Sequence, residues 1–156
     1  MKYVSMLAIL LAVSLALPLA AQEEKQADNM DIVRAAIRAE KKVLIAENMQ
    51  LTESEAKAFW PVYDEYEIAL KAIGDRSVKL IENYAANYQT MTDEAAAKLL
   101  KEFMSIQGDR LKLQESYLPK FQKVLPAVKV ARFYQIENKI RAVVEYDVAS
   151  EIPLIK

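Results

Sequence analysis

The chain contains very few residues that permit tight turns. Two glycines and five prolines serve all 156 residues, whereas a β-sandwich or β-barrel needs a turn about every 8–12 residues. Hydrophobic residues make up 53% of the chain and charged residues 28%, a balance typical of an ordinary globular domain. The sequence therefore predicts one domain of the all-α class.

The first 21 residues have the pattern of a cleavable signal peptide. Lys2 is their only charged residue, an apolar run extends over 4–17, and the small residues Ala20 and Ala21 end the segment. A retained membrane anchor is the alternative, but the run is shorter than the roughly 20 apolar residues that a spanning helix needs. We expect cleavage before Gln22, a periplasmic location, and no stable membrane insertion of the mature protein.

Apolar residues recur every three or four positions in the rest of the chain, which predicts four helices. A polar stretch over 22–28 is expected to precede them. The helices are expected over 29–48, over 53–87, from Thr92 to about Leu125, and after Pro126. Together they form a predicted helical hairpin domain over 29–148, followed by a C-terminal tail over 149–156.

Two helix starts are signalled 40 residues apart, at positions 52 and 92. Thr52 can accept a hydrogen bond from the first turn while Glu55 reaches back to the Thr52 amide, and Leu51 occupies the position of a hydrophobic staple. Met91 and Thr92 repeat the staple and the cap. The spacing indicates that the chain consists of two related halves.

The paired segments Leu51-Thr52-Glu53-Ser54-Glu55 and Met91-Thr92-Asp93-Glu94-Ala95 resemble the doubled Leu-Thr-x-x-Gln motif of the periplasmic LTxxQ-motif family. That family includes Spy-like chaperones and CpxP-like envelope-stress adaptors. Neither segment keeps the glutamine, so both motifs are degenerate. The resemblance implies an elongated four-helix hairpin that dimerises, with clients or regulators held on a concave face by basic and apolar contacts.

The residue types argue against an enzyme. The chain has no histidine and no cysteine, so Ser-His and Cys-His nucleophile pairs cannot form. Its two isolated glycines also exclude a phosphate-binding loop. Soft-metal sites need thiolates or imidazoles, which leaves only weak carboxylate sites for hard cations. We expect no catalytic residues, no metal site and no cofactor.

Tyrosines stand out among the aromatic residues of the second helix and its end. Tyr63, Tyr66, Tyr84 and Tyr88 recur near helical spacing, which is typical of core or dimer packing. A tyrosine also suits an interface where its ring is buried and its hydroxyl stays in contact with water. These four residues are therefore candidates either for the core or for a client-binding surface.

Basic residues are concentrated late in the chain. Ten Lys and Arg but only four acidic residues occur between Lys98 and Arg141. On a helical wheel the five lysines that lie away from the apolar arc fall within roughly 100° of one another: Lys98, Lys101, Lys112, Lys120 and Lys123. They form either an ordinary solvated face or a positive strip that steers acidic or unfolded chains towards a nearby apolar surface.

Charge and helix length bear on the partners. Twenty-one Lys and Arg against 22 Asp and Glu predict no bulk attraction to nucleic acid. Long helices in a short chain make a thin layer that cannot bury every apolar arc, which favours a homodimer. Acidic residues prevail before position 92 and basic residues after Lys98, so an antiparallel homodimer would bring opposite charges together. The expected function is ATP-independent binding of unfolded proteins under envelope stress. The alternatives are a signalling adaptor or inhibitor of a membrane sensor kinase, and a structural adaptor for one fixed partner.

Overall fold

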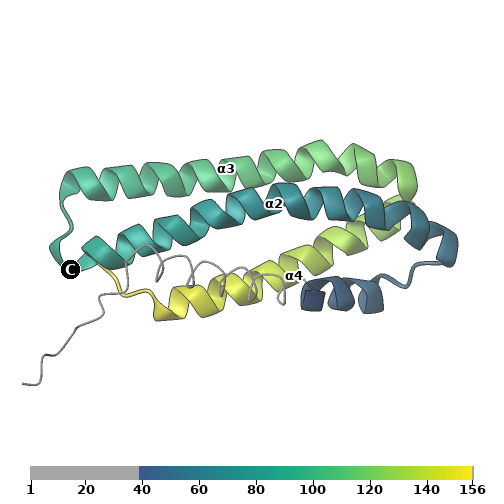
Figure 1. Cartoon of the computed structure of the whole chain (residues 1–156), viewed down its shortest axis with the longest axis horizontal. Coiled ribbons are helices and arrows are strands. Elements are labelled where there is room, and N and C mark those ends of the chain that lie inside the picture. The colour runs from purple at the N-terminus through teal and green to yellow at the C-terminus, as the bar shows by residue number, and fades with distance from the viewer. Residues whose placement is uncertain (1–38, 156) are drawn as a thin grey trace, which may run out of the picture. The chain divides into compact units, whose positions relative to one another are not determined.

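The computed structural model describes residues 39–155, and within this range the chain is all-helical (Figure 1). Residues 39–49 are helical. The elements that follow are α2 (Glu53–Asn87), a short 3-10 turn (Tyr88–Thr90), α3 (Asp93–Val124) and α4 (Ala127–Glu151). The predicted signal peptide over 1–21, the polar stretch over 22–28 and the predicted helix start at 29 lie outside the described residues.

The chain divides into two units, Met1–Glu40 and Lys41–Lys156. All described residues from Lys41 onward belong to the second unit. Its first element is the helical stretch 41–49, which we call the leading segment. In this unit α2 and α4 run in the same direction. The intervening helix α3 runs in the opposite direction (Figure 1).

Both predicted helix starts are confirmed. The Thr52 hydroxyl accepts a hydrogen bond from the Glu55 amide at 3.3 Å, and the Glu55 carboxylate accepts one from the Thr52 amide at 2.8 Å. The Thr92 hydroxyl accepts from the Ala95 amide at 3.2 Å. Only the helix that starts after Thr52 has the second hydrogen bond of a capping box, from the cap amide to a side chain three residues later. Ala95 occupies the equivalent position after Thr92 and has no side-chain acceptor.

Removing either cap is expected to destabilise the fold. Thr52→Ala and Thr92→Ala should each lower the free energy of unfolding by about 1 kcal/mol, because each leaves an amide of the first helical turn without its acceptor. Urea denaturation followed by circular dichroism measures the effect. Thr90→Ala, which removes a threonine that caps no helix, is the matched control. Equal stability of all three variants and the parent would contradict the role given to the caps.

Antiparallel pairing of α2 and α3 is reinforced by ion pairs along its length. The Arg76 guanidinium on α2 donates to Glu102 at 2.9 Å and to Asp109 at 2.7 Å, both on α3. These bonds hold the pKa of Asp109 below its usual range. Farther along the pair, Lys120 of α3 lies 3.3 Å from Glu65 of α2.

The last helix starts where the sequence predicts and extends past the predicted domain boundary. Pro126 directly precedes α4, and its carbonyl accepts from the Lys129 and Val130 amides. The helix continues to Glu151, three residues past the predicted boundary of the domain at 148. Residues 127–152 contain no glycine or proline that would stop the helix earlier. Ile152 ends the helix because it precedes Pro153, and the residue before a proline avoids helical angles.

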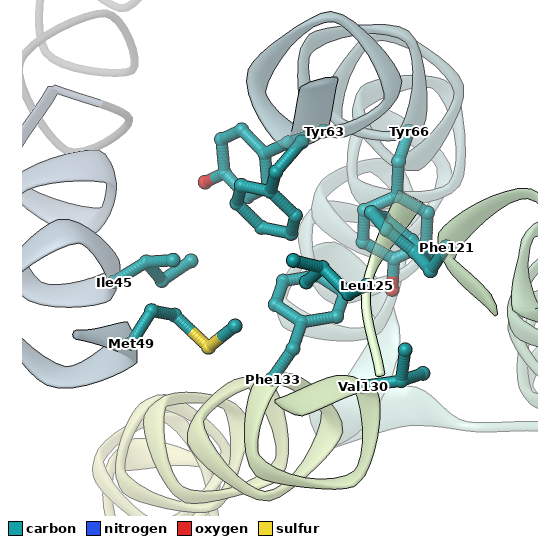
Figure 2. Close-up of a cluster of buried hydrophobic side chains, with 9 residues drawn as sticks. Ile45, Met49, Tyr63, Tyr66, Phe121, Leu125, Val130 and Phe133 are labelled. Carbon is teal, nitrogen blue, oxygen red and sulfur yellow. The ribbon is translucent and has the colours of Figure 1, made fainter. Parts of the chain in front are cut away.

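A buried cluster of aromatic and aliphatic side chains joins the leading segment, α2, α3 and α4. Figure 2 shows Ile45 and Met49 of the leading segment approaching Phe133 of α4, with tyrosines of α2 on the opposite side. The Phe121 and Phe133 ring centroids are 4.6 Å apart, and Phe59 lies 5.3 Å from Phe133. The full cluster comprises Ile45, Met49, Phe59, Tyr63, Tyr66, Phe121, Leu125, Val130 and Phe133.

This cluster occupies one end of the helices. It uses the first half of α2, the end of α3 and the first third of α4. The second half of α4 is much less covered, and four of its large side chains are exposed: Val143, Val144, Tyr146 and Val148. The fold therefore combines a well-packed end with a helix that presents apolar side chains to solvent.

Candidate protein-binding surface

Tyr63 and Tyr66 belong to the core, and their candidate role on a client-binding surface is wrong. Each is 1% exposed. The Tyr66 ring lies 5.9 Å from Phe121 and the Tyr63 ring 6.1 Å from Phe133. Burial is also the main reason that the pKa of each phenol is raised well above its usual value. A client could contact these rings only after the core had opened.

Tyr84 and Tyr88 lie at the opposite end of α2 and are half-buried. Their rings stack with centroids 6.1 Å apart, and the Tyr84 hydroxyl donates a short hydrogen bond to the Pro153 carbonyl. Tyr84 therefore holds the C-terminal tail against the end of α2. It also lines an open hollow of about 600 Å³ together with Ala149 and residues 152–155. A role of Tyr84 and Tyr88 in client binding remains a prediction.

The five lysines of the predicted strip are all exposed on α3. Three of them lie close to acidic side chains: Lys98 pairs with Glu94 at 2.7 Å, Lys112 with Asp109 at 3.3 Å, and Lys120 with Glu65 at 3.3 Å. Lys101 and Lys123 make no ion pair within residues 39–155. The positive field of the strip is therefore weaker than the count of lysines implies.

The strip also lies on a different side of α3 from the exposed apolar side chains of that helix. Leu100, Phe103, Met104, Leu111 and Leu118 are 38–61% exposed. At about 100° per residue they centre roughly 140° away from the five lysines. Within α3 the lysines and the exposed apolar side chains are therefore kept apart, and a role of the lysine strip in steering clients stays a prediction.

Basic and apolar side chains do adjoin in a groove between the leading segment and α4. The groove has a volume of about 400 Å³. Its apolar lining comes from Leu44, Ile136 and Ile140, and its polar lining from Asn48, Arg132, Gln135 and Lys139. Ile136 and Ile140 also pack against the aromatic cluster. These two isoleucines form the floor of the groove and are held in place by the core. Leu44 of the leading segment, in contrast, is 47% exposed.

The rim of this groove is positively charged. The Arg132 Nε donates to the Asn48 carbonyl at 2.6 Å, which fixes the guanidinium beside the groove. Neither Arg132 nor Lys139 makes an ion pair in the part of the chain that the structure describes. A groove with an apolar floor and unneutralised cations on its rim suits a chain segment that carries both apolar and acidic side chains.

The groove was not predicted from the sequence, although its signal is present in α4. Residues at helical spacing line one exposed side of the helix, namely Val128, Arg132, Gln135, Lys139, Val143 and Tyr146. None of the six is acidic. Apolar residues occur all round α4, which obscures this exposed pattern in the sequence.

A buried ion cluster joins the leading segment, α2 and α4. The Lys41 ammonium of the leading segment is 2.7 Å from Glu67 of α2 and 2.9 Å from Glu137 of α4. The Glu137 side chain is only 6% exposed, and this burial raises its pKa although Lys41 acts in the opposite direction. One ammonium therefore links three elements of the unit, and the sequence alone gave no sign of it.

None of the helices within residues 39–155 combines the length and the apolar character needed to cross a membrane. No family model, no curated protein and no solved structure matches this chain. The physical basis for a function is therefore the groove on α4, the exposed apolar side chains of α3 and α4, and the motif resemblance in the sequence.

Proposed function

We propose that this chain is an exported, periplasmic protein that binds partly unfolded proteins without ATP, as a chaperone of the envelope stress response does. In this role the protein has no catalytic residues and no cofactor. It acts as a homodimer of elongated helical subunits, as the resemblance to the LTxxQ-motif family implies. Two threonine-capped helices that start 40 residues apart support that resemblance.

The observation that carries the proposal is the groove between the leading segment and α4. Its apolar lining, with Arg132 and Lys139 on the rim, continues along α4 into Val143 and Tyr146, which are 61% and 74% exposed. Contiguous exposed apolar surface on a soluble domain marks a site of interaction. Unpaired cations beside it accelerate the encounter with acidic chains.

Breadth of binding distinguishes this function from the two adaptor functions. A chaperone should suppress aggregation of several unrelated proteins. An inhibitor of a sensor kinase or a structural adaptor should instead bind one partner and leave unrelated aggregating proteins unaffected. Aggregation assays by light scattering on three unrelated client proteins therefore provide the first test.

A pair of charge variants tests the groove itself. Gln135→Glu combined with Lys139→Glu places two carboxylates along the groove, whereas Gln122→Glu combined with Lys98→Glu makes the same change of charge on exposed positions of α3. We expect the groove variant to lower the association rate for an acidic client roughly tenfold at low salt. The α3 variant should change it much less.

Salt and stability serve as controls for this comparison. The difference between the two variants should shrink as ionic strength rises, because exposed charges are screened beyond about 10 Å at 0.1 M salt. Both variants should unfold within about 0.5 kcal/mol of the parent, since all four positions are on the surface. Equal capture rates for two folded variants would exclude the groove as the binding site.

A further inference from the structure

The leading segment contacts the rest of the unit mainly through four side chains on one side of its helix. Lys41 and Lys42 reach carboxylates, and Ile45 and Met49 are buried in the central cluster. Val43 on the other side is 55% exposed. Anchors that recur at about one helical turn are typical of a helical peptide bound in a groove of another protein.

The surface beneath these four anchors is acidic and aromatic. We call it the docking site, and its residues come from α2 and α4: Tyr63, Asp64, Glu67, Phe133 and Glu137. Its three carboxylates face the two ammonium groups of the leading segment. Arg110 of α3 also acts on Glu137, but without the two lysines the carboxylates outnumber it. Charge complementarity therefore favours basic side chains near the start of a bound helix.

Cations of α4 bind the other end of the docked helix. The Arg132 Nε donates to the Asn48 carbonyl at 2.6 Å, and the Lys129 ammonium donates to the Gln50 carbonyl at 3.1 Å. The last carbonyls of a helix lack donors within the helix and carry partial negative charge, so cations stabilise them. The docking site is therefore suited to the C-terminal end of a helix.

The leading segment leaves two polar atoms of the docking site without a hydrogen bond. The Tyr63 hydroxyl and the Glu137 Oε1 are buried, and neither has a hydrogen-bond partner within residues 39–155. Figure 2 shows the Tyr63 hydroxyl directed towards the leading segment. A lysine donates through one nitrogen, whereas an arginine offers five N–H donors in a planar fork. An arginine would therefore match this site better than Lys41 does.

The link between the leading segment and α2 has an unfavourable backbone geometry. Gln50 has a φ of 50°, in the left-handed region that is costly for a residue with a side chain. An isolated helix shorter than about 12 residues is also marginal in water. The strained link and the two unpaired polar atoms both reduce the free energy needed to release the segment. We expect the leading segment to open before the rest of the unit.

We propose that the leading segment is a releasable occupant of the docking site, and that the released site binds the C-terminal end of a partner helix with an arginine and apolar residues four and eight positions later. This order copies Lys41, Ile45 and Met49. Release would also remove Leu44 and Asn48 from the groove on α4, so it would regulate that groove. The inference goes beyond the proposed function and does not depend on it.

A competing peptide tests the docking site. The probe is a fluorescein-labelled peptide copied from residues 39–50 with Lys41→Arg, and the reference peptide carries Lys41→Glu instead. In the full chain, Lys41→Glu places a third carboxylate beside Glu67 and Glu137 and should release the chain's own segment. This variant should bind the arginine peptide at least tenfold more tightly than the parent does, because its site is no longer occupied. Fluorescence anisotropy measures both constants.

Lys79→Glu is the matched control for the full-chain variant. It makes the same change of charge at an exposed position of α2, twelve residues beyond Glu67 or roughly 18 Å along the helix. We expect this control to bind the arginine peptide as weakly as the parent. Binding as tight as that of Lys41→Glu would overturn the inference, because a general change of charge would then explain it.

Trp60 provides a second readout of docking. It is the chain's single tryptophan, and the Lys42 ammonium lies 5.1 Å from the centroid of its ring. Release of the segment in Lys41→Glu should shift the fluorescence emission of Trp60, and the unlabelled arginine peptide should reverse this shift. A folded variant that fails to bind the arginine peptide, or that binds both peptides equally, would overturn the inference.

Hydrogen exchange on the parent protein tests release without any variant, and it decides alone if Lys41→Glu does not fold. Amides of residues 45–49 should exchange at least tenfold faster than those of residues 63–66, because the segment opens without global unfolding. Equal protection of the two stretches would overturn the inference. Failed capture of acidic clients by a protein that binds the arginine peptide as expected would count against the proposed function alone.

Discussion

Replacing Phe133 with alanine is expected to lower the free energy of unfolding by about 3–5 kcal/mol. The Phe133 side chain is 0% exposed and lies 5.3 Å from the Phe59 ring and 4.6 Å from the Phe121 ring. It therefore connects α4 with α2 and α3 at once. Alanine would leave a cavity at the point where the elements meet, and thermal or urea denaturation measures the loss.

Val128→Ala is the matched control for this change. Val128 lies on the same helix but is 81% exposed, so its truncation should alter stability by less than about 0.5 kcal/mol. The contrast separates the loss of packing from any change in helix propensity along α4. Similar stability losses in the two variants would show that the aromatic cluster does not hold the unit together.

Lys41→Met should have an effect of comparable size at neutral pH. The ammonium lies between Glu67 at 2.7 Å and Glu137 at 2.9 Å, and all three side chains are at most 14% exposed. Methionine would leave two buried carboxylates without their counter-ion, which typically costs about 3–5 kcal/mol. Lys42→Met is the control, because Lys42 pairs with Asp64 at an exposed site.

The loss caused by Lys41→Met should depend on pH in a defined direction. Burial raises the pKa of Glu137 above its ordinary value of 4.5, so the folded state binds this proton more tightly than the unfolded state does. The stability that protonated Glu137 contributes to the folded state is therefore fully present below pH 4.5, and it is lost as pH rises through the folded-state pKa. Without Lys41 the ionised form is disfavoured further, so the variant should lose more stability than the parent as pH rises.

Adding Glu137→Gln to Lys41→Met provides the check on this explanation. The double variant retains no buried charge at position 137, so it should regain part of the lost stability at pH 7 and depend less on pH than Lys41→Met alone. A deficit that is the same at pH 5 and pH 7, and that Glu137→Gln does not reduce, would mean that lost packing of the lysine stem causes it.

The helix starts at positions 52 and 92 could be predicted because a cap is local. Thr52, Glu55 and Thr92 make their hydrogen bonds within three residues, so the pattern of residue types contains all the information required. The same holds for the start of α4 after Pro126. α4 runs on to Glu151 because Ala149, Ser150 and Glu151 carry no stop signal of their own.

The candidate surface could be predicted only in part, because exposure depends on which helices meet. Tyr63 and Tyr84 have the same chemistry, yet Tyr63 is surrounded by rings of α2 and α4 and Tyr84 contacts the tail. The five lysines were correctly expected to be exposed. Their acidic neighbours include Glu65 on another helix, which no spacing within α3 reveals.

Local sequence patterns by themselves determined the all-helical character of this protein and the residues at which α2, α3 and α4 begin. Tertiary structure alone decided that Lys41, Glu67 and Glu137 share one buried site and that Arg132 and Lys139 border an apolar groove. The reason is physical: caps and periodicity act over one or two helical turns, whereas burial and ion pairing depend on side chains up to 96 positions apart. Packing at one end of the helices left the rest of α4 exposed.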